Sequence, residues 1–255
     1  MDIVIIGTGN VATVLGKKLK IGGHRIIQVY GRDATAASKL AYHLETESTN
    51  YWSVIRKDAD VYLIAVADDA IPEVAKHVHV PGKIVVHTAA SVKMDVLKNM
   101  SDHYGVFYPL QSLRKDNHDL PEVPVFIDAI DDFTRKRLEE LARSISKDQV
   151  EIADDDKRLK MHIAAVIVSN FTNHLYKLAE EYCRKEGIDF KLLYPLIDET
   201  ARRVKTISPS KTQTGPAIRN DEPTIQQHLL LLEKYPSLRK VYEMMTESIK
   251  EDQNT

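Results

Sequence analysis

The sequence predicts an α/β protein in which a doubly wound parallel sheet over residues 1–150 is followed by an all-α region over residues 151–255. Three observations lead to this prediction. Apolar runs of strand length alternate with helical patterns up to about residue 150, the first run ends in a glycine-rich turn, and the strand pattern is lost after residue 150. The length of 255 residues suits two modest domains.

The predicted strands are apolar at nearly every position. Residues 61–66, for example, read Val-Tyr-Leu-Ile-Ala-Val, as expected where helices cover both faces of a sheet. Parallel neighbours need a crossover connection, and the segments between the runs carry apolar residues at helical spacing. The sequence therefore predicts strands over residues 3–6, 26–30, 61–66, 84–86, 106–107 and 125–127, and helices over residues 11–19, 34–44, 70–78 and 132–146.

The second half has the pattern of helices only. Residues 154–186 contain neither Gly nor Pro, begin with three aspartates that suit a helix N-terminus, and are followed by Gly187, a residue type that commonly ends a helix. We expect one long helix over this range. Further helices are predicted over residues 190–206, with a kink at Pro195, and over residues 222–235 and 237–251, with a loop over residues 209–220.

The charge balance and the cysteine count limit the class of protein. Lys and Arg total 35 against 37 for Asp and Glu, and the net charge of -2 gives no field to recruit nucleic acid or an anionic membrane. The single cysteine, Cys183, cannot close an intrachain disulfide. The N-terminus lacks the features of a signal peptide, and the longest nearly apolar run, residues 161–168, is too short to cross a bilayer. We expect a cytoplasmic protein without a nucleic-acid or membrane partner.

The first strand ends directly in Gly7-Thr8-Gly9-Asn10-Val11-Ala12, where a helical pattern begins. This is the G-x-G-x-x-A form of the dinucleotide fingerprint of the Rossmann fold. Gly7 permits the tight turn, Gly9 leaves room for a pyrophosphate, and Ala12 lets the helix pack closely on the strand. The helix N-terminus offers unpaired N–H groups to the phosphates. We expect these six residues to bind a dinucleotide; a turn without a ligand is the alternative.

The turn after the second strand, Gly31-Arg32-Asp33, indicates which dinucleotide is bound. Proteins specific for NAD usually place Asp or Glu near this point, on the ribose hydroxyl groups. Arg32 can instead stack on the adenine and pair with a 2′-phosphate, which its planar fork suits. We expect NADP rather than NAD. The alternatives are that Asp33 serves NAD, or that Arg32 is only a solvated loop charge.

Two later strand ends carry small residues that leave space for a cofactor. Ligands of open α/β sheets bind outside the carboxyl ends of the strands, so both loops are expected to flank the nicotinamide ribose. For Asp68 and Asp69, which follow the first loop, we favour capping of the next helix, and Ser91 has the same alternative role. The predicted contacts are Ala65, Val66 and Ala67 in the first loop and His87 and Thr88 in the second.

Later segments add to the fingerprint, in this order: Ala65-Val66-Ala67-Asp68-Asp69, Tyr108-Pro109-Leu110-Gln111-Ser112, Ser169-Asn170-Phe171 and Thr214-Gly215-Pro216-Ala217-Ile218-Arg219-Asn220-Asp221. With them, nearly the whole chain resembles the Rossmann-like proteins that carry domain of unknown function 2520. It is more distantly similar to pyrroline-5-carboxylate reductase, ketopantoate reductase and deazaflavin-linked NADP oxidoreductases, which join a Rossmann domain to a helical dimerisation domain. The resemblance implies a cofactor and a homodimer through the helical domain, and it implies no particular substrate.

Two positions depart from the pattern of that family. Tyr108 stands where the pattern has the His of His-Pro-Leu-Gln, and Asn220 stands where it has the Gly of Arg-Gly-Asp. Tyr108 is a candidate for positioning substrate through its hydroxyl group, with simple packing as the alternative. Gln111 beside it is a candidate substrate contact.

Reduction of a carbonyl or imine needs a proton donor, which the helical half must supply. His162, Ser169 and Asn173 are separated by seven and four residues, which places them within about 40° of one another on an α-helix. Histidine has an unperturbed pKa of about 6.5, so His162 is the candidate general acid. A core histidine, with Ser169 and Asn173 bonding neighbouring helices, is the alternative. Asn170 faces another direction, toward a different wall of the cleft or a subunit contact.

Arg219 lies in a Gly-Pro turn just before a helix that Asp221 is expected to cap. It can clamp a substrate carboxylate, or pair with Asp221 and hold the loop, and we favour the structural role. His77 and His79 have no third ligand nearby, so no metal site is expected. The sequence as a whole predicts an oxidoreductase that moves a hydride between NADPH and a small carbonyl or imine. A non-catalytic NADP-binding sensor and an empty scaffold are the alternatives.

Overall fold

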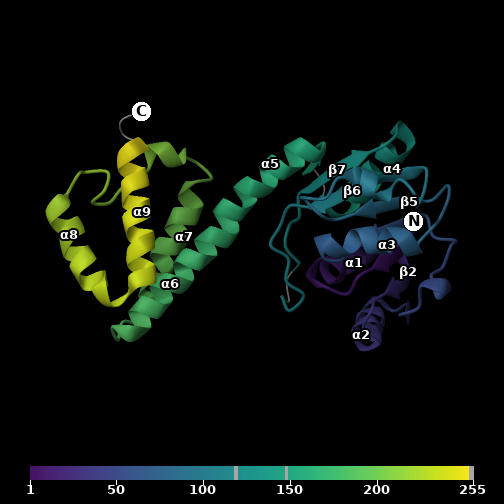
Figure 1. Ribbon diagram of the computed structural model, residues 1–255, viewed down its shortest axis with the longest axis horizontal. Coiled ribbons are helices and arrows are strands. Elements are labelled where there is room, and N and C mark those ends of the chain that lie inside the picture. Colours follow the sequence, from purple (N-terminus) through teal and green to yellow (C-terminus); the bar gives the residue numbers. More distant parts are fainter. Residues whose placement is uncertain (118–119, 147–148, 253–255) are drawn as a thin grey trace. The chain divides into compact units, whose positions relative to one another are not determined.

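The computed structural model describes residues 1–117, 120–146 and 149–252 (Figure 1). The chain forms two compact units, residues 1–169 and residues 170–255. The first unit contains the sheet and its helices, and the described part of the second is helical. The predicted order of an α/β region followed by an all-α region is confirmed.

The described residues of the first unit form an eight-stranded sheet in the order β3-β2-β1-β4-β5-β6-β7-β8. Every pairing from β3 to β6 is parallel, and the first six strands in this order have the arrangement of a Rossmann sheet. The strands are β1 (Asp2–Ile6), β2 (Arg25–Tyr30), β3 (Glu47–Thr49), β4 (Val61–Ile64), β5 (Ile84–His87), β6 (His103–Pro109), β7 (Val125–Ala129) and β8 (Val150–Ile152).

The sheet differs from the prediction at its two edges. Strand β7 runs antiparallel to β6, and the described residues between them contain no helix, because an antiparallel neighbour needs no crossover. Strands β3 and β8 were not predicted. Each has three residues at or near an edge, which is too short for an apolar pattern to be read.

Alternate residues of β1 pack into separate apolar clusters on the two faces of the sheet. Ile3 and Ile5 contact the cluster formed with α1 (Asn10–Ile21), α2 (Ala34–Leu44) and α4 (Asp132–Ser146) on one face of the sheet. Val4 and Ile6 belong to the cluster on the other face, with α3 (Ile71–His77) and the 3-10 turn Met94–Leu97. Each buried side chain of this size stabilises the fold by about 1.5–3 kcal/mol. The two-sided burial explains the continuous apolar runs.

The segment predicted as one long helix has a π-helical interruption. It consists of α5 (Asp155–Ala165), the π-helical segment Val166–Phe171 and α6 (Thr172–Lys185). Asp154 caps its start by accepting from the N–H of Lys157 at 2.8 Å. Gly187 follows its end with φ 71°, the left-handed conformation that glycine adopts without cost. Both predicted ends are confirmed, and the widened turn in the middle was not predicted.

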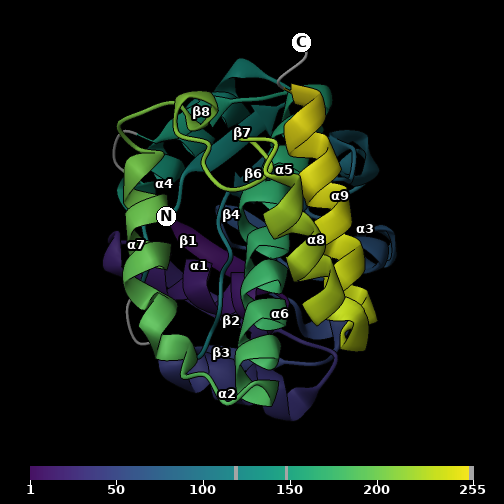
Figure 2. The ribbon, with the colours of Figure 1, turned by 90° about the vertical axis from the view of Figure 1, so that its left-hand side faces the viewer.

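The second unit also contains α7 (Tyr194–Arg203), α8 (Glu222–Leu231) and α9 (Pro236–Asp252). Pro195 lies in the first turn of α7, so the predicted kink is wrong: proline at this position starts a helix, where its missing N–H has no partner to lose. Helices α8 and α9 lie side by side (Figures 1 and 2), and His228 Nδ1 is 2.8 Å from the hydroxyl oxygen of Tyr242.

The second unit has a thin core. Within its described residues, 170–252, the buried side chains are Leu178, Cys183, Ala217, Ile225 and Leu232. Many large apolar side chains of the second unit are exposed, among them Leu192 at 73% and Leu196 at 64%. Across the described parts of the chain, no helix is both long and apolar enough to cross a membrane.

Candidate functional site

A cavity of about 450 Å³ opens at the carboxyl ends of β1, β2 and β4. Strand β1 pairs with β2 on one side and β4 on the other, so this is the point where the strand order changes direction and where ligands of such sheets bind. Ten residues predicted to contact a cofactor line it: Gly7, Thr8, Gly9, Asn10, Val11, Gly31, Arg32, Ala65, Val66 and Ala67. The lining also includes Tyr30, Asp33, Trp52, Ala70, Glu73 and Val74.

The two glycines of the first loop serve different purposes. Gly7 has φ 129°, and a Cβ atom there would lie 2.1 Å from the carbonyl oxygen of Ala65, so no other residue fits. A Cβ atom on Gly9 would meet nothing within 4 Å and would project into open space. Gly9 is also the N-cap of α1 and has no side chain to accept from the first-turn N–H groups. These N–H groups are therefore suited to bind a pyrophosphate.

The next helix, α2, begins differently. Asp33 caps it, and its Oδ1 accepts from the N–H of Thr35 at 2.8 Å and of Ala36 at 3.1 Å. The Asp33 carboxylate is thus engaged at the helix start, while Arg32, one residue earlier, is exposed and lines the cavity. This arrangement offers a guanidinium group to an anionic ligand.

An aromatic stack contributes Tyr30 and Trp52 to the cavity lining, and sequence reasoning missed it. Trp52 stacks on Tyr30 with ring centroids 3.9 Å apart and on His77 with centroids 4.9 Å apart. The three rings come from the end of β2, from the 3-10 turn Trp52–Val54 and from the end of α3. Stacking between residues far apart in the sequence leaves no periodic pattern in that sequence. The one available indication was that Trp52 is the single tryptophan of the chain.

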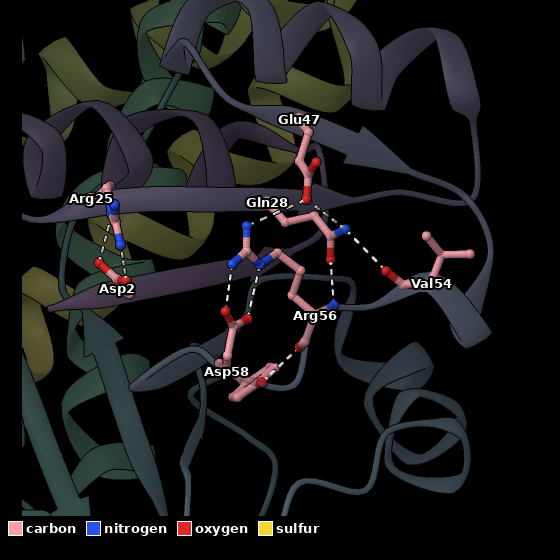
Figure 3. Close-up of polar contacts among 8 residues, drawn as sticks. Asp2, Arg25, Gln28, Glu47, Val54, Arg56 and Asp58 are labelled. Atoms are coloured by element: carbon pink, nitrogen blue, oxygen red, sulfur yellow. Dashed lines mark hydrogen bonds and ion pairs between the residues drawn. The ribbon is translucent and has the colours of Figure 1, made fainter.

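A buried glutamine holds the segment that carries Trp52 (Figure 3). The Gln28 side chain on β2 donates to the carbonyl oxygen of Val54 at 3.1 Å and accepts from the N–H of Arg56 at 2.9 Å. Arg56 in turn bonds Asp58, which lowers the pKa of that carboxyl group to about 2. Gln28 is 2% exposed, so these bonds satisfy an otherwise costly buried amide.

Three of the predicted cofactor contacts lie outside the cavity lining. Ala12 is fully buried between α1 and the sheet, which fits its predicted packing role. Thr88 is buried and donates to the carbonyl oxygen of Ile64 at 3.3 Å. His87 is fully buried, and burial, assisted by the nearby charge of Arg158, lowers its pKa to about 4. His87 is therefore neutral at pH 7, and its Nδ1 accepts from the N–H of Ala89 at 3.2 Å.

Two of the predicted catalytic residues meet. The hydroxyl oxygen of Tyr108, on β6, lies 3.0 Å from Nδ1 of His162, on α5, and the rings are at 79° to one another. Burial of Tyr108, with the charge of Asp68 nearby, raises the pKa of its phenol. Tyr108 therefore stays protonated at neutral pH, and its hydroxyl group forms a hydrogen bond with Nδ1 of His162 whose direction follows the tautomer of the imidazole.

The other residues of the predicted polar stripe are not aligned as expected. The predicted alignment within about 40° holds only for an unbroken α-helix. The π-helical segment Val166–Phe171 lies between His162 and Asn173 and changes the number of residues per turn. Ser169 and Asn170 lie within this segment, and Asn173 lies in α6. Asn170 and Asn173 are exposed, and Ser169 is half-buried.

The remaining candidates lie on loops. Gln111 is exposed, and its side chain donates to the carbonyl oxygen of Glu122 at 2.9 Å and accepts from the N–H of Ser112 at 2.9 Å. Arg219 is exposed in the loop before α8. Asn220 has φ 51°, a left-handed conformation that Asn tolerates and that also suits the Gly expected there from the resemblance.

The caps predicted near these loops were right in one place and wrong in another. Asp221 caps α8, as predicted, by accepting from the N–H of Thr224 at 3.2 Å. The favoured capping by Asp68 and Asp69 is wrong, since the helix start after β4 has no side-chain cap. The alternative role of Ser91 is not found either, since the 3-10 turn Met94–Leu97 that follows it has no side-chain cap. Asp68 instead accepts from the hydroxyl group of Ser91 at 2.5 Å. Within residues 1–117, 120–146 and 149–252 no cluster suited to a metal ion is found.

Two family descriptions match the chain. Residues 2–91 match "NADP oxidoreductase coenzyme F420-dependent", and residues 123–249 match the domain of unknown function DUF2520. No curated protein matches the chain.

Solved structures resemble the chain over its whole length. A putative NADP oxidoreductase from Bacteroides fragilis is 39% identical, with 98% of each chain covered and a TM-score of 0.88. A protein from Thermotoga maritima is 21% identical over 99% of this chain and 100% of its own, with a TM-score of 0.81. An imine reductase from Myxococcus stipitatus in complex with NADP+ shares the fold at 16% identity, covering 100% of this chain and 94% of its own, with a TM-score of 0.67. The chain therefore belongs to the NADP oxidoreductase family in which this N-terminal domain is joined to DUF2520.

Proposed function

We propose that the chain is an NADP-dependent reductase that transfers a hydride from NADPH to a small carbonyl or imine substrate. The observation that carries this proposal is the cavity at the strand ends, where the uncapped N-terminus of α1 and the exposed Arg32 surround one space of about 450 Å³. Membership in the NADP oxidoreductase family supports it.

Arg32 is proposed to select NADP over NAD. Its guanidinium group can bind the 2′-phosphate with two hydrogen bonds, whereas Asp33, the acid that would bind a ribose hydroxyl group in an NAD enzyme, is engaged in capping α2. The pyrophosphate would be held by the first-turn N–H groups of α1 beside Gly9.

The proton is proposed to come from His162. NADPH supplies the hydride when bound, and the developing oxyanion or amine then needs a proton. Protonated His162 donates through Nδ1–H to the Tyr108 oxygen, which leaves Nε2–H to protonate the substrate. Tyr108 thus orients the imidazole. Ser169 and Asn173 stay candidate catalytic residues, and Gln111, Asn170 and Arg219 stay candidate substrate contacts.

The second unit is proposed to form a homodimer interface in a cytoplasmic protein. Its described residues have five buried side chains and a larger set of exposed apolar ones, and contiguous exposed apolar surface marks a contact site. The partner proposed to cover this surface is a second copy of the chain.

Titration with NADPH and with NADH tests the cofactor proposal. Trp52 lines the cavity and is the single tryptophan, so its fluorescence reports on binding directly. NADPH should bind at least about tenfold more tightly than NADH, and Arg32→Ala should remove this preference by weakening NADPH binding alone. Lys39→Ala, which removes an exposed cation of α2 outside the cavity lining, is the control and should bind as the wild type does.

Equal binding of the two nucleotides, or none, would overturn this assignment. Tight NADPH binding without oxidation by any carbonyl or imine would favour a second function, a non-catalytic NADP-binding sensor. The residue in favour of that function is Tyr108, at a position where the resemblance leads us to expect a histidine.

A further inference from the structure

Helix α5 has a single buried side chain, and that side chain is charged. Arg158 is 1% exposed, and no other residue of Asp155–Ala165 is buried. A buried guanidinium group is costly unless it is paired and hydrogen-bonded. An apolar residue would hold a helix at lower cost, so the presence of Arg158 calls for an explanation other than stability.

The hydrogen bonds of Arg158 join the first turn of α5 to the loop that follows β5. Its Nε donates to the carbonyl oxygen of Ala90 at 3.2 Å, and its Nη2 donates to that of Val92 at 2.8 Å. Nη2 also donates to Oδ1 of Asp155 at 2.5 Å, and the same oxygen accepts from the N–H of Met94 at 3.3 Å. These bonds fix both the rotation and the height of α5 above the sheet.

His162 lies one helical turn after Arg158, on the same face of α5. Its partner Tyr108 is on β6, the strand that pairs with β5. The loop after β5 therefore holds one turn of α5, and the next turn meets the neighbouring strand. A rotation of α5 would separate Nδ1 of His162 from the Tyr108 hydroxyl group.

We propose that Arg158 is a positioning residue, which fixes α5 so that His162 meets Tyr108. The catalytic consequence rests on the proposed function, in which this pair supplies the proton. The geometric consequence does not, because the contact between His162 and Tyr108 is measurable in the protein without any substrate.

The test uses the nitrogen NMR signal of His162 Nδ1 at fixed pH, assigned by comparison with His162→Gln. Tyr108→Phe removes the hydrogen bond at Nδ1 and should shift this signal. In an Arg158→Met background the same substitution should leave the signal almost unchanged, because the two side chains no longer meet. Lys160→Met, which removes a cation of α5 whose side chain is 72% exposed, is the matched control and should leave the effect of Tyr108→Phe intact.

The kinetic arm measures NADPH oxidation and NADPH binding in the same variants. A displaced catalytic group costs about 100-fold in rate, so Arg158→Met should lower kcat by about that factor and leave the Kd for NADPH within about twofold. Arg158→Lys keeps the charge but cannot donate to Ala90 and Val92 in the same geometry, and it should recover only part of the coupling and the rate.

The outcomes test the positioning role of Arg158 separately from the proposed reductase function. Full coupling between Tyr108 and His162 in Arg158→Met would overturn the positioning role. If Arg158→Met does not fold, Arg158→Lys decides: reduced coupling supports the role and wild-type coupling overturns it. If the wild type oxidises no NADPH, the proposed function fails, while the NMR measurement of the contact between His162 and Tyr108 still decides the role of Arg158.

Discussion

The two units of the chain bury their apolar side chains to very different extents. Residues 1–169 place the sheet between two apolar clusters, and the sheet residues Ile3, Val4, Ile5 and Ile6 are completely buried. Described residues 170–252 have five buried side chains, and residues such as Leu192 and Leu196 remain exposed. The first unit buries its apolar side chains in its own core, whereas the second has an apolar surface that its own helices do not cover.

The largest expected effect concerns the loop where the first unit binds its ligand. Gly7→Ala places a Cβ atom 2.1 Å from the Ala65 carbonyl oxygen in a left-handed backbone and should lower the free energy of unfolding by roughly 4 kcal/mol. Gly9→Ala projects into open space and should keep wild-type stability but weaken NADPH binding at least about tenfold. Urea unfolding and the Trp52 titration measure the two effects. Equal loss of stability in both variants would contradict this division of roles.

The next effect is a pH dependence of the first unit. The pKa of His87 is about 4 in the fold, below its ordinary 6.5, so the unfolded chain binds a proton that the native chain does not between these values. His87 therefore contributes stability that is present above pH 6.5 and is lost as the pH falls toward 4, by about 3 kcal/mol in total.

His87→Gln cannot titrate, so its free energy of unfolding should change less between pH 7 and pH 4.5 than that of the wild type. Urea unfolding at several pH values gives the free energy of unfolding against pH for the wild type and for His87→Gln. The carboxylates contribute equally to both curves, so their contribution cancels in the difference. Parallel curves would show that His87 protonates in the folded protein without cost.

A surface substitution in each unit tests the contrast in apolar exposure. Leu192→Glu and Leu196→Glu together should raise the dimer dissociation constant by about 100-fold, since two charges would enter an apolar contact. Ile21→Glu, at a position 77% exposed in the first unit, should leave assembly unchanged. Sedimentation velocity over a range of concentrations measures both. A wild type that is monomeric at all concentrations would refute the homodimer.

The contrast also explains how far the sequence could predict the structure. The cavity loop was predictable because Gly7, Gly9 and Arg32 act through local backbone geometry and sequence spacing. The direction of β7 was not, because an apolar run does not encode whether its neighbour is parallel. The Trp52 stack was missed because it joins three elements distant in the sequence.

The helical half shows the limit of periodicity. The ends of the long helical segment were predictable from Asp154 and Gly187, which act at single positions. The π-helical segment Val166–Phe171 was not, because it contains ordinary helix residues, and it invalidated the alignment of His162 with Ser169 and Asn173. The contact between His162 and Tyr108 crosses from a helix to a strand and required the tertiary structure.

The most direct test of the proposed reductase is NADPH oxidation with a panel of small imines and carbonyl compounds, measured for the wild type and for His162→Ala. We predict that the wild type oxidises NADPH with at least one substrate class. His162→Ala should lower kcat at least about 100-fold and leave the Kd for NADPH, read from Trp52 fluorescence, within about twofold. Wild-type turnover in a folded His162→Ala variant would contradict the assignment of the proton donor. Tight NADPH binding without turnover by the wild type would contradict the reductase.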